Sequence, residues 1–435
     1  MVLKVGASRV DVTPSRSVEM AGYPVIRTQA NGPQDHSKYK GRDSKSDGLI
    51  DPVWARAVVI SSEGTNSALV SLDICVIFPE LARAVRERVA ESIKVDWSLI
   101  EICATHTHSG PDISGMSGAI EQDLEDEMVL GIVEAIVNAY KNLEPATITT
   151  AVGQLNGVSI NRRNESDEVD SRLPVIVARR QDNSVIAVIY SFSCHPILVG
   201  AQNTKLYGDF PGAASRKLEN WYGDKSVALF LQGACGDINP RAFPYSKMGN
   251  ITIHAPSGSD EALRIRTISD AERFGEAIAG VVISSVAVSE RETNGSQLHT
   301  VGKSIVLVNL KNHDDLESYL LQRDHNPIRV AQWKNSTQIE LGIAAMVLGE
   351  IVLLFMPGEP FSGTALKLKK DVASPSIKCV WTVGYASDYP GYLVPGHRYS
   401  ENRYENAATI LDATAVDVLV ESLTELGIRV CSAVS

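Results

Sequence analysis

Apolar and polar residues alternate along the 435-residue chain in a way that predicts strands and helices in turn. Short apolar runs of strand type are followed by stretches whose apolar residues recur at helical spacing. The expected strands and hairpins lie within 55–61, 67–78, 100–108, 173–195, 227–237 and 339–359. The expected helices are 79–93, 123–143, 270–289 and 407–427. This alternation predicts an α/β fold of mixed β-sheets flanked by helices.

Local signals support these elements. Pro79 suits the first turn of a helix, and Gly349 suits the turn of the hairpin over 339–359. Gly427 is expected to end the last helix. The polar segments 28–49 and 241–260 are expected to be surface loops. Because no repeat or low-complexity linker interrupts the pattern, one domain over residues 1–435 is expected.

Several apolar runs end in a residue that can bind a metal or carry charge. The residues concerned are His106, His108, His195, Asp237 and Glu359. In sheet-based α/β enzymes the strand ends carry the functional loops, so residues distant in sequence can meet there. Two imidazoles and a carboxylate form a common zinc set. The alternative is that these histidines are hydrogen-bonded core residues.

Further carboxylates could support such a site. Asp73 and Asp209 are candidates for side chains that orient a ligating imidazole through a hydrogen bond. For Asp209 the alternative is an N-cap of the helix that follows it.

Composition and charge restrict the function. A net charge of −11 argues against a nucleic-acid partner, which needs clustered Lys and Arg. No apolar run is long enough for a membrane span, and no amphipathic helix suits a bilayer surface, so stable membrane insertion is not expected. The N-terminus lacks the apolar core of a secretory signal, and the six scattered cysteines are typical of reduced, buried thiols. A cytoplasmic protein is therefore expected. The oligomeric state stays open, with a homo-oligomer among the alternatives.

One segment carries a specific resemblance. The motif "ATHTHSGP" at 104–111 resembles the signature of the neutral ceramidases, the neutral/alkaline non-lysosomal family of zinc amidases. Further motifs follow in the family's order: "INRR" at 160–163, "SCHP" at 193–196, "GDFPGAASRKLE" at 208–219, "GACGDINP" at 233–240, "PGEP" at 357–360 and "DYPGYLVPGHRYSENRYENAATIL" at 388–411. The resemblance implies the family's catalytic-domain fold without its C-terminal immunoglobulin-like domain.

The resemblance also implies roles for individual residues. The implied zinc ligands are His106, His195, Glu359 and Tyr392. Three further residues are implied to act on the substrate: His108 faces it, Tyr404 hydrogen-bonds the scissile carbonyl and Arg162 contacts it. A zinc ion held by two neutral histidines and a carboxylate acidifies a bound water toward neutrality. Tyr404 and His108 can then donate to the oxyanion that forms.

The sequence departs from the family at one position that affects the mechanism. Gly233 stands where the family's ceramidases have a serine that has been proposed as a nucleophile, and Cys235 is interpreted as a packing residue. The expected reaction is therefore hydrolysis of the amide bond of an N-acyl substrate by a zinc-activated water. The alternatives are an esterase or lactonase that uses the same zinc site and a metal-bearing binding protein without activity.

Overall fold

The computed structural model describes residues 2–23, 42, 45–117, 121–241, 267–289, 299–316 and 327–433. Most of the two expected polar loops, 28–49 and 241–260, lies outside the described residues. Within the described ranges, none of the helices combines the length and the apolar character needed to cross a membrane.

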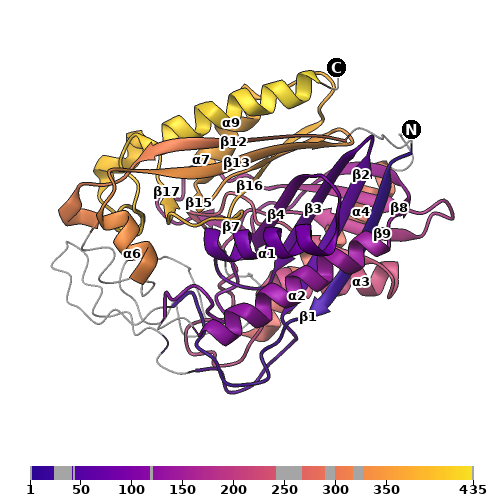
Figure 1. The fold of residues 1–435 in the computed structure, drawn as a ribbon, viewed down its shortest axis with the longest axis horizontal. Helices are drawn as coiled ribbons and strands as arrows, with labels where there is room; N and C mark the ends of the chain where they lie inside the picture. The colour runs from indigo at the N-terminus through magenta and orange to yellow at the C-terminus, as the bar shows by residue number, and fades with distance from the viewer. Residues whose placement is uncertain are drawn as a thin grey trace.

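The first sheet has five strands in the order β4-β3-β2-β1-β5. They are β1 (Lys4–Asp11), β2 (Trp54–Ser62), β3 (Thr65–Leu72), β4 (Trp97–Ala104) and β5 (Glu144–Pro145). Helices α1 (Pro79–Ser92) and α2 (Gln122–Lys141) cover one face of this sheet (Figure 1). The apolar side chains of α1 and α2 join the sheet in one hydrophobic cluster, so the amphipathic spacing read from the sequence fixes which helix face is buried.

The second sheet has the strand order β10-β9-β8-β6 and lies against the first. Its strands are β6 (Thr147–Gln154), β8 (Arg172–Arg179), β9 (Val185–Tyr190) and β10 (Val227–Phe230). The outer face packs on α3 (Asp209–Tyr222) and α4 (Ile268–Ser289) in a separate apolar cluster. Two sheets therefore lie between two layers of helices.

The third sheet has the order β12-β13-β14-β16. Its strands are β12 (His299–Asn309), β13 (Gln338–Leu348), β14 (Ile351–Phe355) and β16 (Cys379–Val383). The final helix α9 (Ala415–Ser432) lies across it (Figure 1), beside α7 (Ser362–Asp371). One apolar cluster contains residues from all three sheets, including Val58, Ile176 and Leu353. This shared core fixes the sheets relative to one another.

Short elements complete the region between the sheets. Two two-stranded ladders pair β7 (Ser159–Asn161) with β11 (Ile238–Pro240), and β15 (Glu359–Pro360) with β17 (Tyr392–Leu393). The C-terminal half of the chain also contains the helices α6 (Pro327–Lys334) and α8 (Tyr404–Ala407) and a 3₁₀-helix (Gly396–Glu401).

Most predicted elements are present, but several predicted boundaries are wrong. The strand expected over 67–78 ends at Leu72, and residues 73–78 leave the sheet although all six are buried. The last helix begins at Ala415 rather than at 407, and it continues past Gly427. A Cβ on Gly427 would lie 2.8 Å from Val372 Cγ1, so this glycine allows close helix packing and does not end the helix.

A buried ionic network joins the first sheet to α3. Arg56 on β2 donates from Nη1 to Asp73 Oδ2 at 3.1 Å and from Nε to Glu219 Oε1 at 2.9 Å. All three side chains are at most 3% exposed. Each of these buried charges is stabilised by its partners, because a charge that is buried without a partner destabilises the folded state.

Arg56→Leu should destabilise the protein by roughly 3–5 kcal/mol, since it leaves Asp73 and Glu219 buried without this guanidinium. Urea unfolding measures the change. Arg16→Leu is the matched control, because Arg16 pairs with Glu127 on the surface, where both side chains are more than a third exposed, and little change is expected. Equal stability of the two variants would contradict this role of the network.

Candidate metal centre

Three strand ends from three different sheets meet at one point. His106 follows β4, His195 follows β9, and Glu359 follows β14 at the start of β15. Glu359 Oε2 lies 3.1 Å from His195 Nε2 and 3.5 Å from His106 Nε2. All three side chains are at most 2% exposed. The predicted convergence of strand-end residues is therefore present in the fold.

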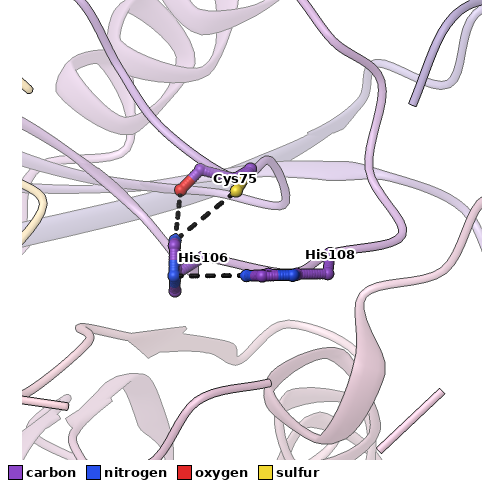
Figure 2. A group of neighbouring side chains, drawn as sticks. All are labelled: Cys75, His106 and His108. Carbon is purple, nitrogen blue, oxygen red and sulfur yellow. Dashed lines mark hydrogen bonds between the residues drawn. The ribbon is translucent and has the colours of Figure 1, made fainter. Parts of the chain in front are cut away.

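Backbone carbonyls fix the tautomers of both imidazoles. His106 Nδ1 lies 2.8 Å from the carbonyl oxygen of Cys75 (Figure 2), and His195 Nδ1 lies 3.0 Å from that of Ile238. Because a carbonyl oxygen only accepts, each Nδ1 carries a hydrogen, and in the neutral imidazole Nε2 presents a lone pair. Both Nε2 lone pairs face Glu359 Oε2, which is also an acceptor. Buried acceptors that face one another need a cation between them, so this donor set fits a metal ion.

The electrostatics of the three groups agree with that geometry. Burial by itself raises the pKa of Glu359, but His106 and His195 outweigh it and hold the carboxyl pKa well below its usual range. Burial lowers the pKa of His106, but the charge of Glu359 prevails and raises it to about 10. Burial and the nearby Arg162 lower the pKa of His195 to about 4. The centre therefore attracts a positive charge, whether a proton or a metal ion that takes its place.

His106 itself has a strained backbone. Its φ of +65° is in the left-handed region that residues other than glycine rarely adopt. Such strain is retained where surrounding structure enforces it and often occurs at functional sites. In Figure 2 the His106 ring lies beside Cys75, and the His108 ring points at it, with Nε2 3.3 Å from His106 Nε2.

Two tyrosines that were not predicted from the sequence hold the carboxylate. Tyr389 O–H donates to Glu359 Oε1, and Tyr385 O–H donates to Oε2 at 3.1 Å. The Tyr385 oxygen also lies 3.0 Å from Cys235 Sγ. Since the single Tyr385 proton is used on Glu359, the thiol is the donor in that second contact. The only signal for these tyrosines in the sequence was their position: Tyr389 lies in the motif at 388–411 and Tyr385 just before it.

The predicted tyrosines and arginine lie together next to the histidines. Tyr392 is opposite Glu359 in the β15–β17 ladder, and its ring stacks on that of His195 at 6.5 Å. The Arg162 guanidinium carbon lies 5.3 Å from the Tyr392 ring centre and 6.0 Å from that of Tyr404. Arg162 Nε donates to Glu405 at 2.9 Å, while its buried Nη2 has no hydrogen-bond partner within the described part of the chain. The ligand role of Tyr392 and the substrate roles of Arg162 and Tyr404 stay predictions.

The carboxylates that were predicted to orient the imidazoles form other contacts instead. Asp73 pairs with Arg56, as described above. Asp209 accepts from the backbone N–H of Val199 and of Phe210 at the start of α3. Asp237, the remaining strand-end carboxylate, accepts from the side chains of Asn161 and Ser362. The orienting groups are backbone carbonyls instead, and a sequence pattern does not single those out.

The positions that depart from the family are also explained by packing. A Cβ on Gly233 would lie 2.2 Å from Ser193 Oγ, so no side chain fits there without displacing Ser193. Cys235 is fully buried, and burial raises the pKa of its thiol well above the usual range. A thiol in this state is a poor nucleophile, in line with a packing role. All six cysteines are buried and none of them forms a disulfide, as expected for reduced thiols.

Comparison with known proteins identifies the family. Residues 3–247 match the family model described as neutral/alkaline non-lysosomal ceramidase, N-terminal. The chain belongs to the neutral/alkaline non-lysosomal ceramidase family. This confirms the resemblance read from the motifs.

Relatives in this family match only part of their own length. A neutral ceramidase of Mycobacterium tuberculosis is 24% identical over 404 residues, which cover 75% of this chain and 62% of that protein. Neutral ceramidase A of Dictyostelium discoideum is 31% identical over 221 residues, 43% of this chain and 30% of that protein.

Solved ceramidase structures share the fold. The crystal structure of neutral ceramidase from Pseudomonas aeruginosa matches with a TM-score of 0.75 at 19% identity, covering 100% of this chain and 75% of that one. A ceramidase complexed with C2 also matches with a TM-score of 0.75, at 17% identity. The predicted α/β fold of mixed sheets and flanking helices is thus confirmed.

The hydrogen bond from Tyr389 to Glu359 can be tested through its effect on metal affinity. Tyr389→Phe should lower the affinity for Zn²⁺ by about 10–100-fold, because Glu359 loses a donor that fixes its orientation. Competition with a fluorescent zinc chelator measures the affinity. Tyr140→Phe on α2, where the ring contacts Trp97, is the control and should bind as the native protein does. Unchanged affinity in Tyr389→Phe would show that this hydrogen bond does not support the metal.

Proposed function

We propose that this protein is a zinc-dependent hydrolase that cleaves the amide bond of an N-acyl substrate. The observation that carries the proposal is that His106 and His195, whose Nδ1 atoms face backbone carbonyls, both direct Nε2 at the buried Glu359 carboxylate. Membership of a ceramidase family supports the reaction class. His106, His195 and Glu359 would hold the ion, with Tyr392 as the proposed fourth ligand. When bound, Zn²⁺ supplies Lewis-acid chemistry by polarising the carbonyl and lowering the pKa of a water.

The chain's own residues would carry the remaining steps. Tyr404 O–H donates a hydrogen bond to the carbonyl oxygen as negative charge develops on it. His108 holds the proton that leaves the attacking water and returns it to the amine nitrogen as the C–N bond breaks. Arg162 binds and orients the substrate through the Nη2 that has no partner in the described protein. Water adds across the bond, giving a carboxylic acid and an amine.

Two features support attack by water rather than by a side chain. Position 233 has no space for a serine side chain beside Ser193, and the Cys235 thiol donates to Tyr385 in a fully buried setting. The proposal therefore contains no acyl-enzyme. The substrate is proposed to be a small or medium N-acyl compound, and a cytoplasmic location is part of the proposal.

A panel of N-acyl amines and matched esters tests the function. The zinc-loaded native protein should contain one equivalent of zinc and release amine, and His106→Ala combined with His195→Ala should lose both properties. His313→Ala is the control, because that histidine side chain is 66% exposed and should tolerate the change. Turnover of esters alone would favour the esterase alternative. Full zinc binding without any turnover would favour a metal-bearing binding protein.

A second test separates the two predicted tyrosines. Tyr404→Phe should lower kcat by about a hundredfold and keep its zinc, because it removes an oxyanion donor without touching the metal. Tyr392→Phe should weaken zinc binding as well. Measuring kcat and zinc content for both variants distinguishes the two roles. Normal turnover in Tyr404→Phe, or zinc loss equal to that of Tyr392→Phe, would contradict this division of roles.

A further inference from the structure

His108 differs from the other two histidines in how its ring is held. His106 and His195 are each oriented by a hydrogen bond from Nδ1 to a carbonyl oxygen. His108 Nδ1 is buried and has no hydrogen-bond partner among the described residues. Its Nε2 is nevertheless directed at His106 Nε2, 3.3 Å away. Among the described residues, packing therefore positions the Nδ1 side of this ring.

The N-terminal segment supplies that packing. Gly22 has a φ of +98°, and a Cβ built on it would lie 2.4 Å from His108 Cγ and 2.7 Å from its Nδ1. The backbone of Gly22 therefore lies directly against the imidazole, and only glycine fits there. The ring of Tyr23 meets that of His108 edge-on, with centroids 4.9 Å apart and planes at 71°. Together Gly22 and Tyr23 limit the rotation of the His108 ring.

Arg42 holds this segment and the His108 backbone in place. Its guanidinium donates to three carbonyl oxygens, those of His108 at 3.0 Å, Ala21 at 3.3 Å and Asn203 at 2.7 Å. Its backbone N–H donates to the carbonyl of Tyr23 at 2.9 Å, and its guanidinium carbon lies 5.3 Å from the centre of the Tyr23 ring. The side chain is well buried, and three separate parts of the chain are joined by one rigid planar group.

We propose that Gly22, Tyr23 and Arg42 form a clamp that fixes the imidazole of His108 with Nε2 toward the metal centre. In the hydrolysis proposed above, on which the functional part of this inference rests, they are positioning residues that act through His108. A proton-transferring group must be held close to its productive geometry, and a small displacement can cost a large factor in rate. The clamp supplies the constraint that the hydrogen bonds to carbonyls supply for His106 and His195.

Gly22→Ala tests the clamp directly. The new Cβ must displace the His108 ring, so kcat should fall by about tenfold or more while KM and zinc content stay near native values. Gly223→Ala is a closely matched control. Gly223 has a φ of +99°, close to the +98° of Gly22, but a Cβ there meets nothing within 4 Å. The folded control should keep its native kcat, and a native kcat in Gly22→Ala would overturn the positioning role.

A stability cycle gives a readout that does not need activity. Gly22→Ala should lower Tm more in the native background than in a His108→Gly background, where the contacting ring is absent. Equal Tm losses in the two backgrounds would overturn the contact. If the native protein hydrolyses nothing on the panel, the proposed function fails, but this cycle still decides whether the clamp exists.

Arg42→Lys provides a second variant in case Gly22→Ala does not fold. Lysine keeps the positive charge but cannot reach three carbonyls with one planar group. The expected result is again a lower kcat with zinc retained, together with a broadened or shifted His108 imidazole resonance in NMR spectra of the zinc-loaded protein. A native kcat and an unchanged His108 resonance would contradict the clamp.

Discussion

Glu359 is a carboxylate removed from water, and the arrangement of the centre follows from how that burial is compensated. An isolated buried carboxylate would be protonated or expelled. Here Tyr385 and Tyr389 donate to its two oxygens, and His106 and His195 face one of them. Because backbone carbonyls take the Nδ1 hydrogens, the neutral imidazoles present their Nε2 lone pairs to the carboxylate. The balance is complete only when a positive charge lies between the three groups.

The fold makes this meeting possible because each of the three groups comes from a different sheet. His106, His195 and Glu359 extend from β4, β9 and β14, and one apolar core contains residues of all three sheets. The distances between the side chains are therefore set by packing between sheets, which is close and resists deformation. The buried Arg56 network adds a polar connection between the first sheet and α3. Residues that determine the site thus include many that never approach it.

Several parts of this picture could be read from the sequence, and others could not. Apolar periodicity and the residues at strand ends predict both the α/β fold and the convergence of His106, His195 and Glu359. Periodicity failed at 73–78, because a buried run that leaves a sheet has the same apolar character as a buried strand. It failed at Gly427 because this glycine lies in close contact with Val372, the residue that follows α7, and a sequence pattern does not reveal that contact.

The groups that orient the two imidazoles show most clearly what a sequence alone does not reveal. Sequence reasoning offered Asp73 and Asp209 as candidates for orienting the imidazoles, with an N-cap as the alternative for Asp209, since carboxylates are visible in a sequence. The structure uses the carbonyls of Cys75 and Ile238, which every residue type possesses. The contacts of Gly22 and Arg42 with His108 are also not visible in the sequence, because the path of the backbone brings these residues together.

The most direct test of the central claim is the position of the metal. Crystals of zinc-loaded protein, measured on both sides of the zinc absorption edge, should give one strong anomalous peak. The account predicts that the peak lies about 2.0–2.1 Å from Nε2 of both His106 and His195 and about 2.0–2.2 Å from a Glu359 oxygen. No peak at this point, or a peak on the opposite side of His106 next to Cys75 Sγ, would contradict it.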